Sequence, residues 1–439
     1  MALCVDVSLS PTSGFDDPRY RSGLQLMRQS AGKHLSRAGP LPAHMKLILF
    51  LGSGVSVPSG LPTADQLTRS IFLRAYHQDG HFHFSRGSRP KSVALHADDT
   101  SRIRHLLKLL RDYDRHDRKR IGHARSGRFS SGALFRGPNT TYEDIYHLSR
   151  QMASWSSGLA DTSFVTPLMD IIQRKAGTLL APCSALSRMS ELGCLAERAC
   201  AFIECAVADA LRAPRILGLD LILQLADAPF IEDLTIITLN HDCLVEDLFS
   251  QNNISLKDGF GASDGDVRWY DDGNYDVHHI KATLLKLHGS INWYQFTPGS
   301  RRAIFNGVAT AHIKDGKGNR LTPIFDRPSF LSGMSKAVQY YRGIYADVHF
   351  RFQKALRESD VIVMSGYGWG DVAITFQLEA WLDRNSSNRI VHLHKNPDSI
   401  KEKSLTFESA RDYWTNGRQL ILVHRWLSEV TLDELIEYL

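Results

Sequence analysis

The chain has 439 residues and a formal net charge of +5 in an otherwise ordinary globular composition. This length suits one large α/β domain with an insertion, or two domains, and the small net charge does not by itself indicate a nucleic-acid partner. No apolar run is long enough to cross a membrane, and the N-terminus lacks the basic and apolar regions of a secretory signal.

The six cysteines are typical of a protein in a reducing compartment rather than of a disulfide framework. None of them belongs to a Cys-x-x-Cys pair, so a zinc site built on paired knuckles is not expected. We therefore expect a cytoplasmic protein with no bound metal and no membrane contact.

Residues 1–44 are rich in Ser, Pro, Gly and Arg and show little periodicity. Three interpretations are open for this N-terminal arm: a mobile segment, an oligomer contact, or a stretch that precedes a natural start at Met45. The sequence does not separate them, and we treat the arm apart from the domain that follows.

An apolar run over 46–51 ends in Gly52-Ser53-Gly54. The run predicts a buried parallel strand, and the glycines predict a tight turn after it. A capping-box pattern then predicts a helix over about 63–76. Together these features are typical of a phosphate site, because glycines admit the phosphate and free N–H groups point at it. The alternative is a turn with no ligand, since the spacing is not that of a nucleotide-binding loop.

After a His- and Gly-rich loop, the sequence predicts a helical insertion over about 101–230. Amphipathic patterns indicate a helix over 102–110 and a helix pair over 184–211. Another helix opens at Tyr142, with Thr140 as its expected cap. We interpret the first residues of this helix as exposed to solvent, and the alternative is that their side chains face the cleft. These residues are Tyr142, Glu143 and Asp144.

The segment 111–136 is conspicuously basic, with Ser and Gly interleaved. We interpret it as a solvated loop, and the alternative is a surface that binds nucleic acid or a protein partner. Its aromatic residues, which could stack on bases, are few and include Phe129 and Phe135.

An α/β pattern returns after the insertion. Apolar runs predict further buried strands at 234–239, 284–287, 361–364, 390–393 and 420–423. Helices are expected at 243–251, 335–357, 372–384 and, as a terminal helix, 431–439. Short alternating stretches within 254–325 predict hairpins beside the main sheet. The whole pattern predicts an α/β fold, a parallel sheet flanked by helices with an inserted, mostly helical subdomain.

Polar or glycine-rich turns follow four of the predicted strands. They are Gly52-Ser53-Gly54, Asn240-His241-Asp242, Gly366 to Asp371, and His394-Lys395-Asn396. In doubly wound sheets, ligands bind beyond the carboxyl ends of the strands. We therefore expect these turns to converge on one crevice.

Four stretches together resemble the sirtuin-like family, in its bacterial NAD-consuming branch. They are Leu51 to Ser56 with Ser59 to Pro62, Thr238 to Asp242, Lys286 to Trp293, and Val363 to Asp371. Their order and their placement at strand ends make the set specific, and the resemblance spans about 46–425. It implies a Rossmann-like catalytic domain over 45–430 that takes NAD+ as its substrate.

The resemblance also implies a role for each matched position. The phosphates of NAD+ would contact four residues of the first turn: Gly52, Ser53, Gly54 and Ser56. The adenosine end would contact residues of the later turns: Gly366, Tyr367, Asp371, His394 and Asn396. The catalytic residues would be Asn240, Asp242 and His288.

These residue types suit cleavage of the nicotinamide–ribose bond, which leaves an oxocarbenium-like sugar. Neutral Asn240 can hold a water and a ribose hydroxyl without quenching the sugar cation. His288 can accept a proton near neutral pH and is interpreted as a general base, with a plain turn residue as the alternative. Asp242 would orient a ribose hydroxyl or stabilise positive charge, and its alternative role is the N-cap of the following helix.

Two features differ from protein-deacylating sirtuins. Those proteins usually carry a Cys-x-x-Cys zinc module and Pro-Asp-Phe-Arg after the glycine turn, whereas Pro62 is followed here by Thr63-Ala64-Asp65. The resemblance therefore favours an NAD+ glycohydrolase that releases nicotinamide and ADP-ribose. The alternatives are a non-catalytic module that binds NAD or ADP-ribose, and a protein deacylase or ADP-ribosyltransferase.

Similar proteins act in bacterial anti-phage defence, where NAD+ depletion stops the infected cell in an abortive infection. No sensor domain is recognisable in this sequence. By analogy with such systems, we expect a homo-oligomer that works with a separate partner such as a HerA-like DNA-translocase ATPase.

Overall fold

The computed structural model describes residues 44–73, 76–78, 81–83, 97–124, 140–156, 162–175, 185–213, 215–296, 305–309, 313–325, 327–333, 336–401 and 405–439. Except for residue 44, the predicted N-terminal arm lies outside these ranges. Within them, no helix is both long and apolar enough to cross a membrane.

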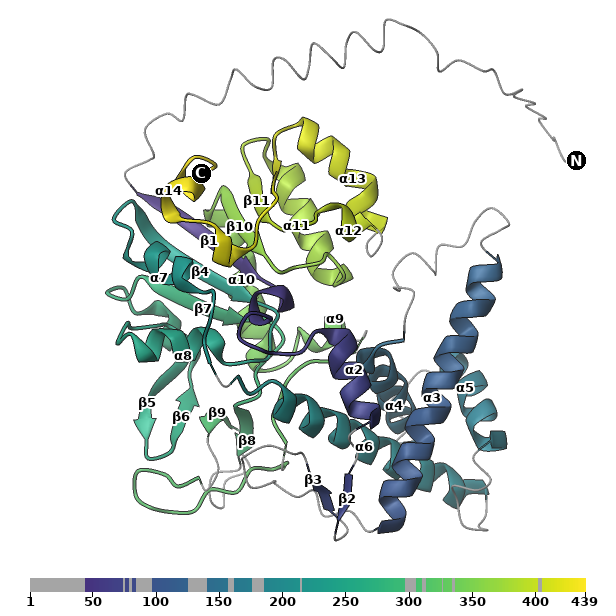
Figure 1. Cartoon of the computed structure of the whole chain (residues 1–439). Coiled ribbons are helices and arrows are strands. Elements are labelled where there is room, and N and C mark those ends of the chain that lie inside the picture. The colour runs from purple at the N-terminus through teal and green to yellow at the C-terminus, as the bar shows by residue number, and fades with distance from the viewer. Residues whose placement is uncertain are drawn as a thin grey trace, which may run out of the picture.

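A six-stranded parallel sheet forms the centre of the protein (Figure 1). Its strands are β1 (Met45–Leu51), β4 (Ile231–Thr238), β7 (Ala282–Lys286), β10 (Val361–Ser365), β11 (Arg389–Leu393) and β12 (Leu420–Val423). They lie in the order β12-β11-β10-β1-β4-β7. This is a doubly wound Rossmann-type order, whose winding reverses between β1 and β10. The predicted fold class is confirmed, and each of the predicted strands overlaps an observed one.

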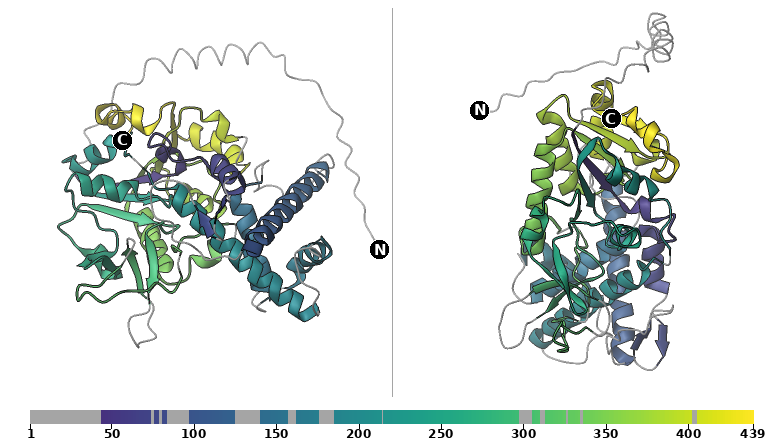
Figure 2. Two further views of the ribbon diagram at one scale, coloured as in Figure 1. Left: turned by 60° about the horizontal axis from the view of Figure 1, so that its bottom comes forward. Right: turned by 90° about the vertical axis from the view of Figure 1, so that its left-hand side faces the viewer.

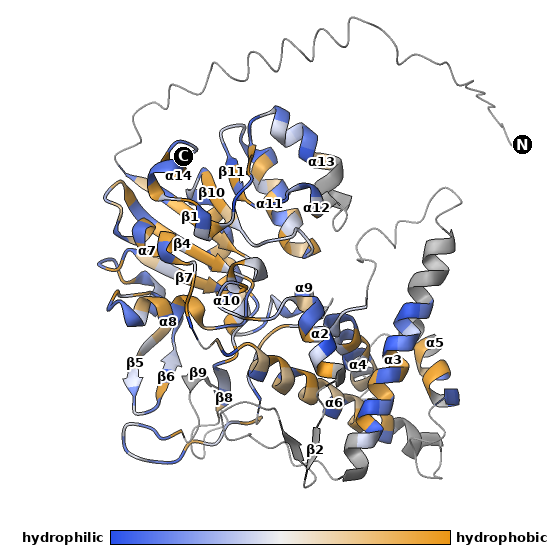
Figure 3. Cartoon of the chain, in the orientation of Figure 1, coloured by the Kyte–Doolittle hydropathy of each residue, from blue (hydrophilic) through white to orange (hydrophobic). Residues whose placement is uncertain are grey.

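Helices cover both faces of the parallel sheet. They are α7 (Asp220–Asp227), α8 (Leu244–Gln251), α10 (Ile344–Glu358), α11 (Val372–Arg384), α13 (Leu405–Asn416) and α14 (Leu432–Ile436). Leu47 and Leu49 of β1 enter a core with α7, α8 and α14, whereas Ile48 and Phe50 enter a core with α10, α11 and α13. Because side chains alternate along a strand, an uninterrupted apolar strand must be covered on both sides. Figure 3 shows these apolar strands between their helices.

The helices between β1 and β4 form a layer with its own core (Figure 1 and Figure 2, left). They are α2 (Ala64–Leu73), α3 (Ala97–Ala124), α4 (Tyr142–Ser156), α5 (Thr162–Lys175) and α6 (Ala185–Ala210). Gly193 lets α6 approach α4, because a Cβ at this position would collide with the Ser156 side chain. The helix α7 lies inside the predicted insertion over 101–230, yet it packs on the parallel sheet.

Short antiparallel strands lie beside the main sheet, as the alternating stretches within 254–325 predict. They are β5 (Phe260–Asp264), β6 (Val267–Tyr270), β8 (Trp293–Phe296) and β9 (Phe305–Ala309), in the order β5-β6-β9-β8. A small hairpin, β2 (Tyr76–Gln78) and β3 (His81–His83), occurs where the sequence indicates only a loop. The remaining short elements are α9 (Lys336–Gln339), α12 (Asp398–Lys401), η1 (Ser53–Ser56), η3 (Asp272–Asp276) and η4 (Leu427–Glu429).

Three helices differ in extent from their predictions. The helix α3 continues to Ala124, so the first half of the basic segment 111–136 is helical rather than a loop, because its Arg and Lys residues are good helix formers. Residues 125–136 lie outside the described ranges. The helix α6 is one helix instead of a pair. The predicted helix over 335–357 is divided into α9 and α10, and Gly343 begins α10 with a left-handed φ of 51°.

The start of α4 also differs in its cap. The amide of Thr141 donates to Asp144 Oδ2 at 2.8 Å, and the amide of Asp144 lies 3.4 Å from Thr141 Oγ1. The expected cap, Thr140, instead donates its hydroxyl to Asp114 Oδ2 of α3 at 2.6 Å. Thr141 therefore holds the helix start in a reciprocal capping arrangement, and Thr140 ties α4 to α3.

We expect Gly52→Ala to destabilise the fold, because the added Cβ would collide with the carbonyl oxygen of Gly366 and lie 2.6 Å from the Cα of Tyr367. Backbone cannot move aside as a flexible side chain can, so overpacking should cost about 1–3 kcal/mol of unfolding free energy. Thermal melting is the measurement. Gly370→Ala is the control, since no heavy atom lies within 4 Å of its Cβ. Equal melting temperatures for the two variants would contradict this explanation.

Candidate active site

The turns after β1 and β10 pack backbone against backbone at the point where the winding of the sheet reverses. The amide of Gly52 donates to Ser365 O at 2.9 Å, and the amide of Gly54 donates to Gly366 O at 3.0 Å. A Cβ on Gly54 would lie 2.7 Å from the Cα of Gly366, whose φ of 69° favours glycine. These glycines permit the close approach of two turns. The free amides expected for a phosphate are therefore not found at Gly52 and Gly54.

Asn240 and Asp242, which follow β4, reach the first turn through Ser56. Asn240 Nδ2 donates to Gly52 O and to Ser56 Oγ, both at 3.0 Å, and Ser56 Oγ donates to Asp242 Oδ2 at 2.7 Å. Asp242 Oδ1 accepts from the amide of Leu244 at 3.2 Å, so it also holds the start of α8. The side chains of Ser56, Asn240 and Asp242 are buried. Their mutual bonds fix the orientation of the Asn240 amide.

A buried ion pair supports the same turn from β7. Lys286 Nζ lies 2.7 Å from Glu246 Oε1 of α8 and donates to the carbonyl oxygen of Asp242. Burial alone would lower the pKa of Lys286, but the nearby acidic groups, of which Glu246 has the largest effect, together outweigh burial and raise that pKa. Lys286 therefore stays charged and fixes the backbone that carries Asp242.

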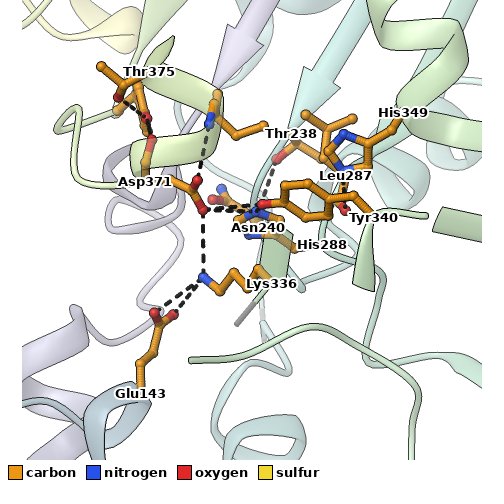
Figure 4. Close-up of polar contacts among 12 residues, drawn as sticks. Glu143, Thr238, Asn240, Leu287, His288, Lys336, Tyr340, His349, Asp371 and Thr375 are labelled. Carbon is orange, nitrogen blue, oxygen red and sulfur yellow. Dashed lines mark hydrogen bonds and ion pairs between the residues drawn. The ribbon is translucent and has the colours of Figure 1, made fainter. Parts of the chain in front are cut away.

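His288 follows β7 and makes its polar contacts with groups from later in the chain (Figure 4). Its Nε2 lies 3.2 Å from Asp371 Oδ2 and 3.0 Å from the Tyr340 hydroxyl. Asp371 Oδ1 accepts from the amide of Ile374 at 3.2 Å and caps α11. Asp371, which the sequence assigns to the adenosine end of the substrate, thus contacts the catalytic candidate directly.

Lys336 extends this cluster to the helical layer. Its Nζ lies 4.0 Å from Asp371 Oδ2 and 3.2 Å from each carboxylate oxygen of Glu143 on α4. The Lys336 side chain is 11% exposed, whereas the Glu143 side chain is 35% exposed. This contact matches the alternative interpretation of Glu143, in which its side chain faces the cleft, rather than that of a solvated helix start.

The protonation of the cluster follows from burial and charge. Burial lowers the pKa of His288, the positive charge of Lys336 lowers it further, and Asp371 opposes both effects. His288 is therefore neutral near pH 7. Burial alone would raise the pKa of Asp371, but its hydrogen bond with His288 and the charge of Lys336 hold that pKa well below its usual range. Burial raises the pKa of Tyr340, so its hydroxyl keeps its proton.

The loop between β10 and α11 presents small residues to open space. Gly368 and Gly370 are exposed, and a Cβ at either position would meet no heavy atom within 4 Å. Tyr367 between the turn and this open stretch is buried, and its hydroxyl lies 3.1 Å from Asp371 O and 3.0 Å from Thr375 Oγ1. Tyr367 therefore holds the loop, and the glycines leave room for a ligand beside the N-terminus of α11.

The last predicted turn follows β11. The amide of His394 donates to Val423 O at 3.0 Å, and its ring centroid lies 5.1 Å from that of Trp426. Asn396 is exposed. Since β11 pairs with β10, both residues follow a strand next to the one that leads to Asp371, at the same edge of the sheet. Within the described ranges, no group of three or more metal-ligating side chains gathers here or elsewhere.

Two residues of the site carry no recognisable signal in the sequence. Lys336 and Tyr340 lie in and just after α9, far from every stretch on which the family resemblance rests. Their roles depend on long-range contacts with Asp371 and His288. The spacing between Lys336 and Tyr340 is the only local hint, because residues four apart share one side of a helix.

Ser56→Ala is expected to lower stability by about 1–3 kcal/mol, because buried groups of Asn240 and Asp242 each lose a hydrogen-bond partner. Denaturant unfolding measures this change. Ser53→Ala in the same turn is the matched control, since Ser53 is exposed. If the two variants unfold at the same denaturant concentration, Ser56 does not hold the two turns together.

Comparison with known proteins identifies the region that carries most of these side chains, including Asn240, His288 and Asp371. Residues 234–414 match the model of the SIR2-like domain. One similar solved structure is a mutant Sir2 homologue in complex with ADP-ribose. The two sequences are 14% identical, the match covers 90% of this chain and 92% of that chain, and the TM-score is 0.33. A Sir2 homologue with NAD matches at 12% identity, 90% and 89% coverage, and a TM-score of 0.32. The search of curated proteins returned no match. Residues 234–414 of this chain are therefore similar to a SIR2-like domain.

Proposed function

We propose that this protein is an NAD+ glycohydrolase that cleaves NAD+ to nicotinamide and ADP-ribose. The observation that carries the proposal is the placement of two catalytic candidates at the carboxyl ends of neighbouring strands, Asn240 after β4 and His288 after β7. Ligands of doubly wound sheets bind at this edge, near the reversal of winding. The match to a SIR2-like domain and the complexes of similar proteins with NAD and ADP-ribose support NAD+ as the substrate.

Asn240 is suited to the sugar cation that develops as the nicotinamide bond breaks. Both of its amide hydrogens point to partners in the first turn, Gly52 O and Ser56 Oγ. Its carbonyl oxygen has no hydrogen-bond partner among the described residues, and it can accept from a water or a ribose hydroxyl. A fixed carbonyl dipole also stabilises nearby positive charge without forming a bond to it.

His288 is suited to take the proton released when water adds to the sugar. Because it is neutral near pH 7, its imidazole has a nitrogen lone pair available. Asp371 holds the ring in place and balances the positive charge that the ring gains with the proton. Asp242 is held by Ser56 and the start of α8, so its part is to position the Asn240 turn.

Two other functions remain as outcomes of the test. A non-catalytic module would bind NAD or ADP-ribose without releasing nicotinamide. A protein deacylase or ADP-ribosyltransferase would release nicotinamide only when an acyl-peptide or another acceptor is present. The cluster of His288, Asp371 and Lys336 favours hydrolysis over mere binding, because a binding site has no need for a neutral, oriented base in a charged setting.

Purified protein, alone and with candidate partners, should release nicotinamide and ADP-ribose from NAD+, as measured by chromatography of the products. We expect Asn240→Ala and His288→Ala to reduce turnover by at least about 10²-fold, because each removes a group that acts on the reacting atoms. Asn252→Ala and His279→Ala are matched controls at exposed positions. Retained turnover in both site variants would overturn the assignment of these residues.

The pH dependence of kcat should report the lowered pKa of His288. Hydrolysis requires the neutral imidazole, so the rate should stay level as the pH falls through the ordinary histidine value of about 6.5. It should decline only when the pH reaches the lowered pKa that burial produces. Steady-state rates measured between pH 4.5 and 8 test this. Circular dichroism at each pH identifies the values at which the protein stays folded, and only those are compared. A decline centred above about 6.5 would contradict the assignment of His288.

The resemblance to anti-phage proteins supports a further proposal about biological role. The protein would act in the cytoplasm as an oligomer, deplete NAD+ during infection, and be controlled by a partner such as a HerA-like DNA-translocase ATPase. The basic segment 111–136 would contribute any contact with nucleic acid. Cells carrying the wild-type chain and its neighbouring genes should lose NAD+ after infection and yield fewer phage, whereas cells with His288→Ala should not. Equal phage yields would exclude the defence role.

A further inference from the structure

We propose that Lys336 is a positioning residue for the catalytic histidine and that Glu143 of the helical layer holds Lys336 in place. Lys336 would anchor the Asp371 carboxylate that orients His288, and α4 would thereby complete an active site that the SIR2-like region does not complete alone. This inference rests on the proposed hydrolysis of NAD+, and it adds two residues to the machinery assigned above.

The geometry centres on one oxygen atom. Asp371 Oδ2 lies 3.2 Å from His288 Nε2, 3.4 Å from the Tyr340 hydroxyl and 4.0 Å from Lys336 Nζ. The other oxygen, Oδ1, accepts from the amide of Ile374 at the start of α11. The carboxylate thus has a fixed backbone anchor on one side and three groups on the other (Figure 4). Removing Lys336 would leave the carboxylate with fewer constraints on the side that faces His288.

Burial makes these contacts strong. The side chains of His288, Lys336 and Asp371 are 4%, 11% and 14% exposed, so water screens their interactions only weakly. A buried ammonium needs anionic partners, and Lys336 has two: the nearby Asp371 and the bidentate Glu143. Glu143 is therefore the group that keeps the Lys336 ammonium beside Asp371.

The charges of the cluster favour a proton on His288 during the reaction. With His288 neutral, the cluster holds one cation, Lys336, and two carboxylates, Asp371 and Glu143. A proton on His288 would balance these charges. The cluster can therefore accept the proton that hydrolysis releases without building up excess positive charge in a buried place.

Glu143 connects this chemistry to a different part of the fold. It lies in α4, outside the matched region 234–414, and α4 packs in the separate core of the helical layer. A shift of that layer relative to the sheet would move Glu143 and, with it, Lys336. The helical layer is thus placed to influence the histidine through a chain of two ion pairs.

The test uses the opposite effects that two neighbours have on His288. Titratable and charged groups around the ring are Asp371, Lys336, Tyr340, His349, His241 and Glu143. Lys336 lowers the pKa of His288 and Asp371 raises it. We therefore expect Lys336→Met to raise the pKa of His288 and Asp371→Asn to lower it. If Lys336 and Asp371 only supported the fold, the two substitutions would not shift the pKa of His288 in opposite directions.

Imidazole NMR titration of the full-length protein measures these shifts without any enzymatic activity, with the His288 signal assigned by its loss in His288→Gln. Glu143→Gln should shift the pKa of His288 in the same direction as Asp371→Asn, because Glu143 also raises it. Lys354→Met is the control, since it removes an exposed lysine whose ion pair is with Glu358 on α10. An unchanged His288 pKa in Lys336→Met would overturn the proposal, whether or not the protein hydrolyses NAD+.

The kinetic measurement separates positioning from substrate binding. We expect Lys336→Met to lower kcat about tenfold or more while KM changes little, and Lys336→Arg to recover part of kcat by restoring the charge. If KM rises and kcat is unchanged, Lys336 binds substrate and the positioning role is wrong. If Lys336→Met does not fold, the His288 pKa in Lys336→Arg and Glu143→Gln decides, because Lys336→Arg should keep it near the wild-type value.

Discussion

The contact between the two glycine turns at the centre of the sheet is the constraint on which the site depends. The amides of Gly52 and Gly54 bond to carbonyls at the end of β10, and no side chain fits between the turns. Because these turns meet, Ser56 is brought within reach of Asn240 and Asp242, and Asp371 is brought within reach of His288. The glycines therefore act through their lack of a side chain, which lets polar side chains that follow four strands come into contact.

The site is a composite of groups that lie far apart in sequence. The SIR2-like region supplies Asn240, His288 and Asp371, the first turn supplies Ser56, and the helical layer supplies Glu143. Two buried ion pairs support it from different directions, Lys286 with Glu246 and Lys336 with Glu143. Each keeps a carboxylate or carbonyl in place beside one of the proposed catalytic residues. Apolar residues in place of Lys286 and Lys336 could not fix the positions of the neighbouring polar groups in this way.

Much of the fold could be predicted from the sequence because its signals are local. A run such as 46–51 has enough buried apolar surface to identify a parallel strand by itself, and a glycine turn follows directly. Helix boundaries were less predictable: α3 continues into a charged segment, and Gly343 separates α9 from α10. Asn240 and His288 were recognisable because they sit in short motifs at strand ends. Lys336 and Tyr340 were not, because only the folded chain brings them to Asp371.

The central position of β1 has a consequence for how the chain must fold. Of the described strands of the parallel sheet, β1 is synthesised first, yet Leu47 pairs with Leu234 on one side and with Val361 on the other. Until those segments are synthesised, the backbone N–H and C=O groups along its edges lack their hydrogen-bond partners, and unpaired strand edges promote aggregation. The helical layer follows directly and has its own core, so it can assemble before the sheet closes. In the nascent chain, this early helical core would lie beside an unfinished sheet that is complete only after β10, β11 and β12 have been synthesised.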